Sequence, residues 1–539
     1  MSASTSLPKK RVAAKKNNAA SAKPGRIAQD RRRRGQGRSD GQPYDIVIAG
    51  GGPAGATLAW KLASQGVKVL VLERTRFPRE KVCGDYVEPR GLRILGQMGG
   101  LAALEATSPL PITHSSTWVD DRCEYSGKIP FYGVHDTLPP HGYIVPRHVL
   151  DTLLLEIAAR QGAEVHYESY VSGFTWNGSS GRNGVTVQVQ RKDASESWRA
   201  RAIVGADGVN SVVARTAGLL VNDPRHIALS QRAYVTGYSG RVGEAAFFFD
   251  AEFFPGYGWM FPMSGGMANI GVGILKETCQ REGIAVPELF LQFFEKLKTS
   301  HPACRRLKLC KPAIGGIVKT YGCAGPNYFD RGLLIGDAGC FVDPMTGEGI
   351  TPAMESALLA ARVLMRALKD GNFGSAALSI YEKEHRDYFG PAMVFTDLCA
   401  ATLRNPHYWP SWKRAIVRGC RLAQHDKTFA ATAGGCFGGI EVQPAGILAE
   451  VWKKTAESLV ALGPQSAAEL MQGKVTTATS ALREGAGWLI DSWKSIANDP
   501  LWHAGWLLDV QGKWVRAAES MIQGRTDPRA QGVSQETMA

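Results

Sequence analysis

Three glycines and an acidic residue in the first part of the sequence have the spacing of a ligand-binding motif. Gly50, Gly52 and Gly55 form a G-x-G-x-x-G pattern, and Glu73 follows the first glycine by 23 residues. The first glycine permits a tight turn, the second lets the backbone approach a pyrophosphate, and the third lets a helix pack on a strand. Free N–H groups at the helix N-terminus bind the pyrophosphate, and the acid accepts hydrogen bonds from a ribose. The group predicts a dinucleotide site.

A second group of candidate binding residues begins at Asp337, which directly follows the apolar segment Leu333–Gly336. An acid at the end of a buried strand is costly unless it is hydrogen-bonded, and a hydroxylated cofactor tail would satisfy it. The glycine-rich run 343–349 precedes a helix expected from about Pro352. Its glycines let backbone approach a flat ring, and the positive helix end favours negative charge on that ring. A reduced flavin carries such charge, so the two groups together predict FAD.

The elements that position these groups follow from hydrophobic patterning. Apolar runs at Ile46–Ala49 and Val67–Leu72 flank the first glycine turn and its helix, which predicts a parallel βαβ unit. Further strands are expected at 164–167, 185–190, 201–208, 232–238, 245–248, 258–261 and 268–273, with a helix over about 147–158.

We therefore expect an α/β fold with a Rossmann-like FAD-binding domain, an inserted sheet-rich substrate domain and a helical C-terminal region. The FAD-binding domain is predicted to be discontinuous. The predicted bounds are 43–110, 145–215 and 320–375 for FAD binding, 111–144 and 216–319 for substrate, and 376–539 for the Trp-rich helical region.

Composition restricts the class of protein. The chain has 539 residues, 44% of them hydrophobic and 21% charged, which is typical of globular proteins. Its apolar runs are shorter than the ~18–20 residues of a membrane span, so we expect membrane contact to be peripheral. The ten cysteines form no C-x-x-C pair or metal-like cluster, which predicts a reducing, cytoplasmic location and no metal.

The two ends of the chain carry separate signals. Residues 1–42 hold twelve Lys or Arg and two Asp, most of the net charge of +14, and predict a disordered tail. A solvated tail, attachment to anionic lipid and organelle targeting are the alternatives, with no specific nucleic acid expected. Residues 446–539 hold six of the 13 Trp. These predict either an interfacial membrane face or helices packed on the body.

Three signatures in this order resemble the FAD-dependent oxidoreductases of the p-hydroxybenzoate hydroxylase fold, over about residues 43–370. They are the first glycine turn, the segment Ala206-Asp207-Gly208-x-Asn210-Ser211-x-x-x-Arg215, and Gly336-Asp337-Ala338. The resemblance implies that Glu73 binds the adenosine ribose, Asp337 the ribityl chain and the Val171 backbone the adenine, with Arg147 near the flavin and Asp207 and Gly208 in support. The other cofactor residues that it implies are Pro53, Ala54, Arg74, Cys83, Gly84, Gly336, Pro344, Gly347, Glu348, Gly349 and Ile350.

Within that fold the sequence is most similar to the geranylgeranyl reductase family. The similarity lies in residues 77–85, in Tyr257-Gly258-Trp259-Met260-Phe261-Pro262 with the later Asn269-x-Gly271-x-Gly273, and in residues 343–349. This family reduces isolated double bonds of polyprenyl chains on lipids, quinones or chlorophyll precursors. The resemblance implies a hydrophobic isoprenoid substrate and leaves NADPH or a reduced carrier protein as the electron donor.

Cys83, Tyr257 and Trp259 are the catalytic candidates. Hydride transfer to an unconjugated alkene requires a proton at the other carbon and a site without water. Tyr257, Trp259 and Phe261 alternate along a strand, so they wall a prenyl tunnel or form sheet core. Cys83 faces the flavin or is a small core hydrophobe. Asp85 and Glu348 lie in the segments that resemble the family. Instead of a role in the site, Asp85 could cap a helix and Glu348 could lie at the surface of the flavin loop.

Other flavin chemistries share the fold. A class A monooxygenase or epoxidase, acting on an aromatic or on a polyprenoid such as squalene, has all three nucleotide signatures. A flavin halogenase is expected to carry a Trp-x-Trp-x-Ile-Pro segment, which this sequence lacks. A non-enzymatic scaffold would not need the intact glycines and acids of the cofactor signatures.

Overall fold

The computed structural model describes residues 43–129, 139–178, 184–323, 325–427, 430 and 494–526. The basic tail before residue 43 and the Trp-rich segment 431–493 lie outside the described residues, so the predictions for them remain predictions.

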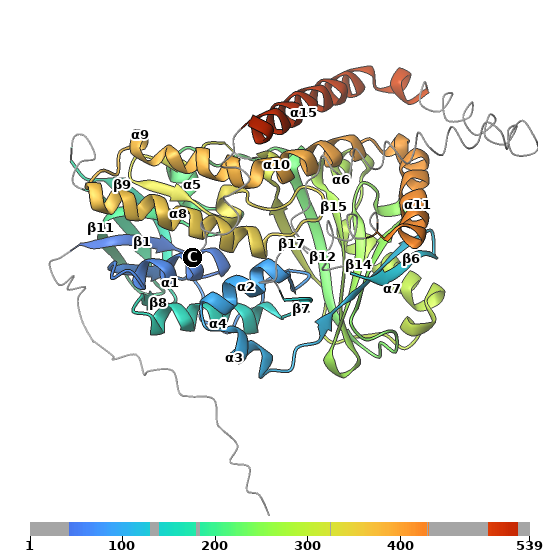
Figure 1. The fold of residues 1–539 in the computed structure, drawn as a ribbon, viewed down its shortest axis with the longest axis horizontal. Coiled ribbons are helices and arrows are strands. Elements are labelled where there is room, and N and C mark those ends of the chain that lie inside the picture. The colour runs from blue at the N-terminus through green and yellow to red at the C-terminus, as the bar shows by residue number, and fades with distance from the viewer. Residues whose placement is uncertain are drawn as a thin grey trace, which may run out of the picture. The chain divides into compact units, whose positions relative to one another are not determined.

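An eight-stranded sheet carries the first glycine turn (Figure 1). Its central strands run β8-β2-β1-β11-β19, and each neighbouring pair among them is parallel. The βαβ unit at its centre consists of β1 (Tyr44–Ala49), α1 (Pro53–Ala63) and β2 (Val69–Leu72), as predicted. The other strands are β8 (Glu164–His166), β9 (Tyr170–Trp176), β10 (Val185–Gln190), β11 (Ser195–Gly205), β18 (Tyr328–Phe329) and β19 (Gly332–Leu334).

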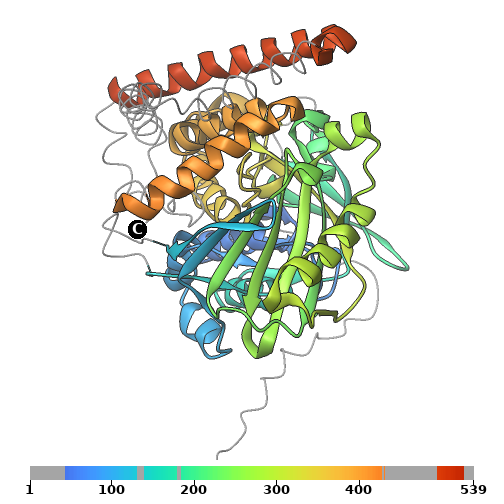
Figure 2. The same ribbon diagram turned by 90° about the vertical axis from the view of Figure 1, so that its right-hand side faces the viewer.

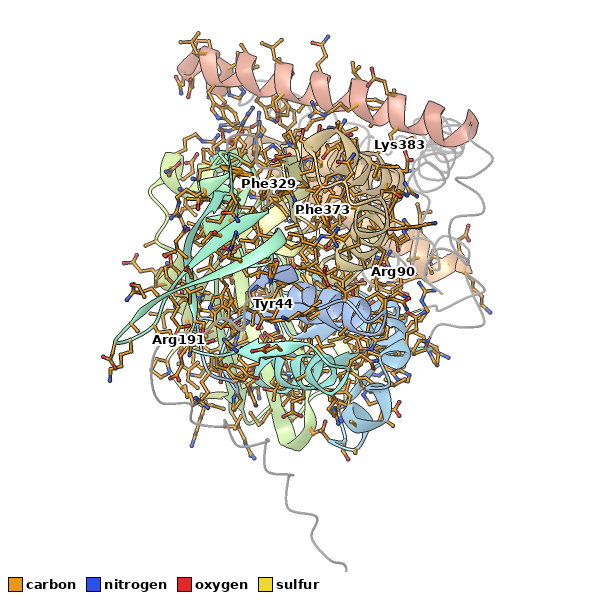
Figure 3. All side chains as sticks on the ribbon, turned by 90° about the vertical axis from the view of Figure 1, so that its left-hand side faces the viewer. Tyr44, Arg90, Arg191, Phe329, Phe373 and Lys383 are labelled. Atoms are coloured by element: carbon orange, nitrogen blue, oxygen red, sulfur yellow. The ribbon has the colours of Figure 1, made fainter. Side chains whose placement is uncertain are left out.

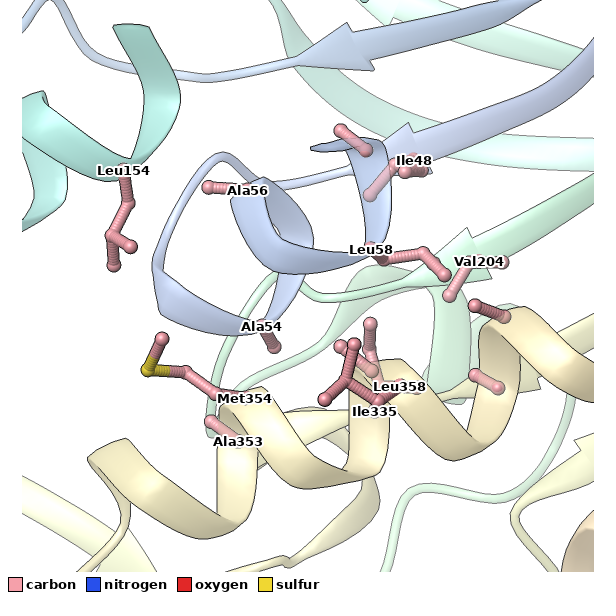
Figure 4. Close-up of a cluster of buried hydrophobic side chains, with 14 of the residues drawn as sticks. Ile48, Ala54, Ala56, Leu58, Leu154, Val204, Ile335, Ala353, Met354 and Leu358 are labelled. Carbon is pink, nitrogen blue, oxygen red and sulfur yellow. The ribbon is translucent and has the colours of Figure 1, made fainter. Parts of the chain in front are cut away.

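Alternate residues of β1 face two different cores, which is why this strand is apolar throughout. Ile46 and Ile48 pack against α1, α4 (Arg147–Arg160) and α8 (Ile350–Asp370), while Val47 and Ala49 pack against β9 and β10. Figure 4 shows the first of these cores, which contains Ile48 of β1, Leu58 of α1 and Leu358 of α8. The elements that carry the two predicted cofactor groups thus share one core.

A second sheet lies beside the first and has the order β16-β12-β15-β14-β13-β5-β6, with β17 also paired to β12. One face packs against α7 (Val286–Ser300), and the other faces a small sheet of β3, β7 and β4 (Figures 1 and 2). The strands are β3 (Tyr86–Val87), β4 (Pro111–Ile112), β5 (His114–Val119), β6 (Arg122–Lys128), β7 (Gly142–Ile144), β12 (Ile227–Thr236), β13 (Glu244–Phe249), β14 (Tyr257–Met263), β15 (Met267–Leu275), β16 (Lys308–Leu309) and β17 (Ile314–Lys319).

Helices complete the body. Side chains fill the space between helices and sheets, with Phe373 buried inside and Lys383 at the surface (Figure 3). The remaining helices are α2 (Pro89–Gln97), α3 (Leu101–Glu105), α5 (Val212–Thr216), α6 (Lys276–Glu282), α9 (Ser375–Leu378), α10 (Ile380–Leu403), α11 (Trp409–His425) and α15 (Pro500–Thr526). The predicted α/β fold class is confirmed.

Helix α15 packs on α10 through its polar side. Lys513 Nζ lies 2.6 Å from the Asp397 carboxylate, and Arg404 pairs with Asp509 at 3.0 Å. Trp506 is buried and donates its indole N–H to the carbonyl of Ala401 at 2.8 Å. Of the helices in the described ranges, none combines the length and apolarity needed to cross a bilayer.

Candidate active site

The glycine turn brings α1 against the ends of β1 and β11. Gly50 has a φ of +98°, and a Cβ there would lie 2.3 Å from the carbonyl oxygen of Ala206. A Cβ on Gly55 would lie 2.0 Å from the carbonyl oxygen of Gly50. Gly52 is the N-cap of α1 and provides no side-chain cap, so the helix N-terminus remains available to an anion.

Two arginines share one carboxylate beside this turn. Asp151 accepts two hydrogen bonds from Arg147, at 2.7 and 2.9 Å, and pairs with Arg79 at 3.0 Å. The Arg79 guanidinium is also the nearest group to a Cβ built on Gly52, at 3.6 Å. Burial acts to lower the pKa of Arg147, but the charge and hydrogen bonds of Asp151, together with Cys83 and Asp337, raise the pKa above its usual value. The two guanidinium groups and the one carboxylate therefore leave a net charge of +1 beside the N-terminus of α1.

Arg79 was missed at the sequence level, although it lies within a segment that resembles the family loop. The signal available in the sequence was a basic residue directly after Pro78. Its pairing with Asp151 joins residues 72 positions apart, which local patterning does not reveal.

The predicted adenosine end lies at the other side of the turn. Glu73 is buried, and its carboxylate accepts hydrogen bonds from the backbone N–H groups of Gly51 and Thr75, both at 2.9 Å. Ser169 donates its N–H to the carbonyl of Glu73, which brings the buried Val171 of β9 into the same region. Arg74 is exposed.

Asp207 lies outside the cavity lining and supports the site by holding nearby backbone in place. Its carboxylate accepts hydrogen bonds from Ser211 Oγ at 2.5 Å and from the N–H of Val212 at 2.7 Å, so it holds the start of α5. Gly208 has a φ of +84°, and no atom lies within 4 Å of its Cβ position. The open space there would be filled by any side chain larger than glycine.

Asp337 lies at the end of β19 and pairs with Lys81 at 2.9 Å. Burial acts to raise the pKa of Asp337, but the Lys81 ammonium and its hydrogen bond, together with the charges of Arg147 and Arg79, lower the pKa below its usual value. The carboxylate is therefore ionised and can accept hydrogen bonds from hydroxyl groups. Gly336, immediately before it, has a φ of +56° and packs against Ala54 of α1.

The following loop is fixed by side chains that bind its own backbone. Asp343 accepts hydrogen bonds from the N–H groups of Met345 and Thr346, at 2.9 and 2.8 Å. Glu348 accepts the N–H of Thr351 at 2.8 Å, at the N-terminus of α8. Burial raises the pKa of Glu348, and the nearby carboxylate of Glu88 raises it further. The surface alternative for Glu348 is wrong, because the side chain is half-buried and lines the central cavity.

A cavity of about 230 Å³ joins the flavin loop to the second sheet. It brings together many of the predicted residues: Pro53, Cys83, Gly84, Arg147, Tyr257, Trp259, Asp337, Pro344, Gly347, Glu348, Gly349 and Ile350. The remaining predicted residues lie outside its lining, at the glycine turn, at the adenosine end or behind Asp337: Gly50, Gly52, Ala54, Gly55, Glu73, Arg74, Val171, Asp207, Gly208 and Gly336.

The wall opposite the flavin loop is aromatic. Tyr257, Trp259 and Phe261 lie on one face of β14 and line the cavity together with Phe247 of β13. Trp259 and Phe261 are also packed in a core cluster, so these side chains belong to the sheet core and line the cavity, while a prenyl tunnel stays a prediction. The hydroxyl of Tyr257 donates to the carbonyl of Thr346 and ties this wall to the flavin loop.

Glycines of β15 make room for the Trp259 indole. A Cβ on Gly271 would lie 2.3 Å from Trp259 Cζ2, so only glycine fits under the ring. The indole N–H donates to Asn269 Oδ1 at 3.0 Å, and the Asn269 amide donates in turn to the carbonyl of Cys83 at 2.9 Å. The Asn-x-Gly-x-Gly segment therefore positions both Trp259 and the loop that carries Cys83.

Cys83 lines the cavity as a thiol. Burial raises its pKa, with the charge of Arg147 acting in the opposite direction. The side chain is therefore protonated near neutral pH and is not a thiolate nucleophile.

Asp85 is a buried member of the same loop and not a helix cap. Its Oδ2 accepts hydrogen bonds from the Tyr234 hydroxyl and from Asn269 Nδ2, the latter at 2.9 Å. The N-cap of α2 is Glu88 instead. The helix-cap alternative for Asp85 is therefore wrong, because the partners that determine its position come from β12 and β15.

These residues fit FAD. The uncapped N-terminus of α1 beside Arg79 suits a pyrophosphate. Asp337 offers an ionised acceptor, and a Cβ on Gly349 would lie 3.7 Å from its Oδ1, so backbone comes close to this carboxylate. A flat ring in the cavity would have the flavin loop on one side and the aromatic wall of the second sheet on the other.

Comparison with known proteins agrees with this geometry. Residues 43–239 match a family described as FAD binding domain. Digeranylgeranylglycerophospholipid reductase 1 of Methanopyrus kandleri is 31% identical over 358 residues, which cover 64% of this chain and 88% of that protein. Menaquinone reductase of Mycolicibacterium smegmatis is 30% identical over 343 residues, or 59% of this chain and 76% of that protein.

A solved structure of similar fold is a geranylgeranyl bacteriochlorophyll reductase-like protein from Thermoplasma acidophilum. Its TM-score is 0.58 at 23% identity, with 67% of this chain and 88% of that chain covered.

Proposed function

The chain belongs to the geranylgeranyl reductase family of FAD-dependent oxidoreductases, and we propose that it saturates isolated double bonds of a polyprenyl chain. The observation that carries this proposal is the cavity between the flavin loop and the aromatic wall of β13 and β14. A polyprenyl chain is apolar and flexible, and aromatic side chains on one wall hold such a chain by burying its surface.

When bound, reduced FAD supplies a hydride to the double bond. The side chains of the protein position the cofactor and the substrate. We propose that Arg79 and the α1 N-terminus bind the pyrophosphate, that Asp337 binds the ribityl chain, and that Glu73 binds the adenosine ribose. Tyr257 and Trp259 would hold the alkene over the ring and exclude water from it.

The relatives described above are named as reductases of a digeranylgeranyl glycerophospholipid and of menaquinone. Both compounds carry a prenyl chain on a larger head group. We propose the same substrate class here and assign the head group to the region of residues 111–144 and 216–319. NADPH and a reduced carrier protein both remain candidate electron donors. A monooxygenase acting on an aromatic or on a polyprene such as squalene is the alternative, since it shares the FAD-binding elements.

We also propose that α15 contacts the membrane from which a lipid substrate is drawn. Its polar side packs on the body, which leaves an apolar side outward, with Leu501 86%, Leu508 69% and Trp514 51% exposed. An amphipathic helix with outward leucines and a tryptophan suits an interfacial position. Trp506 packs on the body, as the second interpretation of the Trp-rich region predicts, and the proposed interfacial role belongs to the outward side chains of α15.

The proposed function is tested by anaerobic single turnover. Photoreduced enzyme is mixed with a digeranylgeranyl glycerolipid or with menaquinone, and the visible absorbance of the flavin is followed. Recovery of oxidised flavin without oxygen, together with a product whose prenyl chain has gained two hydrogens, supports the reductase, and a preference for one substrate identifies its head group. Flavin that stays reduced with every prenyl substrate contradicts it.

A further inference from the structure

Reduction of an isolated double bond requires an acid as well as a hydride. We propose that Asp85 is this acid, and that it donates a proton directly to one alkene carbon; this inference rests on the proposed reductase function. Asp85 is fully buried and lines the cavity within the loop that carries Cys83. It has a φ of +65°, an uncommon conformation for a residue other than glycine, Asn or Asp.

The hydrogen bonds of Asp85 determine where its proton lies. Oδ2 accepts from both Tyr234 and Asn269, whereas Oδ1 is buried and has no hydrogen-bond partner among the described residues. When the carboxyl group is neutral, its proton therefore belongs on Oδ1, since Oδ2 is occupied by two donors. Oδ1 is therefore the oxygen from which a proton can leave Asp85 without breaking a hydrogen bond to the protein.

The surroundings of Asp85 allow both protonation states near neutral pH. Burial raises its pKa to about 6. Tyr234 and Arg232 of β12, Asn269 of β15 and Arg147 of α4 act in the opposite direction, and without them the pKa would be higher still. The group thus donates a proton and regains one from water between turnovers.

The aromatic wall distinguishes Asp85 from the other acids of the cavity. A Cβ on Gly84, the preceding residue, would lie 3.0 Å from the Phe261 ring, and Asn269 joins Asp85 to the Trp259 indole. Asp85 therefore lies at the end of the cavity where the prenyl chain is proposed to bind.

Two other acidic groups of the cavity, Tyr257 and Glu348, are held by hydrogen bonds to the backbone of the flavin loop and of α8. Tyr257 donates its hydroxyl to the flavin loop, and burial raises its pKa. Glu348 holds the N-terminus of α8. Burial raises the pKa of Glu88 to about 7, but Glu88 lies near Arg90 and Glu348 at the α8 end of the cavity. Glu88, the Cys83 thiol and the Tyr86 hydroxyl, which has no hydrogen-bond partner among the described residues, are the rival donors. Glu88 is the carboxyl among them that a variant must exclude.

The step balances with the reduced flavin as hydride donor. The O–H bond of Asp85 breaks as a C–H bond forms at one alkene carbon, and the hydride forms the second C–H bond at the other. The double bond becomes a single bond, and the Asp85 carboxylate takes up one proton from water.

Three variants test the assignment in the holoenzyme: Asp85→Asn, Glu88→Gln and Tyr234→Phe, with Asp250→Asn as the control. Asp250 is also a buried carboxyl whose pKa is raised by burial, but it lies outside the cavity lining. Infrared difference spectra between pH 5 and pH 8 should show a protonated carboxyl band that disappears in Asp85→Asn and persists in the other variants. This measurement requires no turnover.

Single-turnover rates provide the second measurement. In wild type, flavin reoxidation by the prenyl substrate should fall about tenfold per pH unit above the Asp85 pKa. Asp85→Asn should slow it by about 10²- to 10⁴-fold and remove this dependence, while FAD binding and reoxidation by oxygen are unchanged. Tyr234→Phe removes a hydrogen bond that lowers the pKa, so it should move the pH dependence upward.

The outcomes separate the two proposals. A wild-type enzyme that reduces no prenyl substrate refutes the proposed function, and the role of Asp85 with it. An Asp85→Asn enzyme as fast as wild type, or a pH dependence that disappears in Glu88→Gln instead, overturns Asp85 alone. Should Asp85→Asn not fold, an unmoved pH dependence in Tyr234→Phe overturns the assignment.

Discussion

Replacing Asp337 by alanine should separate cofactor binding from folding. The Asp337 carboxylate pairs with Lys81 at 2.9 Å, and the two side chains are 14% and 38% exposed. Because Lys81 is partly solvated and is not left buried, loss of this pair should lower the free energy of unfolding by about 1 kcal/mol or less. A hydrogen bond from a ribityl hydroxyl to a carboxylate contributes about 1.5–3 kcal/mol. Asp337→Ala should therefore weaken FAD binding by about 10- to 150-fold.

The assay titrates apoprotein with FAD and follows the quenching of flavin fluorescence, beside thermal unfolding by circular dichroism. Lys81→Met is the matched control, because it removes the same ion pair and keeps the carboxylate. It should change stability as Asp337→Ala does, with a much smaller effect on FAD affinity. If Asp337→Ala binds FAD as tightly as wild type, Asp337 does not bind the ribityl chain.

Three further changes have defined outcomes. Gly271→Val places a side chain on the Trp259 ring and should cost about 1–3 kcal/mol in urea unfolding; unchanged stability would contradict the packing. Burial and the Lys513 ammonium lower the pKa of His226 to about 4, from 6.5. The unfolded state therefore binds an extra proton between these values, and stability should fall by up to about 3 kcal/mol on acidification from pH 6.5 to 4. His226→Gln should remove this loss, as measured by denaturation at a series of pH values. Leu508→Glu should abolish sedimentation with lipid vesicles without altering the melting temperature, and unchanged sedimentation would contradict a membrane role for α15.

Local patterns predicted the nucleotide-binding elements well. The apolar run before Gly50, the glycine spacing and the acid at Glu73 each act within one βαβ unit, so short-range sterics determine them. Strand β10 was predicted with its observed bounds, Val185–Gln190. The alternation of aromatic residues from Tyr257 predicted that they share a face, although it did not predict which core that face meets.

Long-range contacts account for what the sequence did not predict. Asp85 lies in a loop, and its partners Tyr234 and Asn269 are 149 and 184 residues away on strands of the second sheet. A local pattern offered a helix cap there because an acid precedes a helical segment. The docking of α15 likewise depends on ion pairs such as Arg404 with Asp509, which join distant parts of the chain.

The mass of the product most directly tests the proposal that this flavoenzyme is a prenyl reductase. Reduced holoenzyme is given a geranylgeranyl lipid in parallel reactions with and without oxygen, and the product is analysed by mass spectrometry. The structure and its relatives predict a product that gains two hydrogens per reduced bond in the absence of oxygen. A product that forms only with oxygen and gains one oxygen atom would contradict the reductase and favour the monooxygenase.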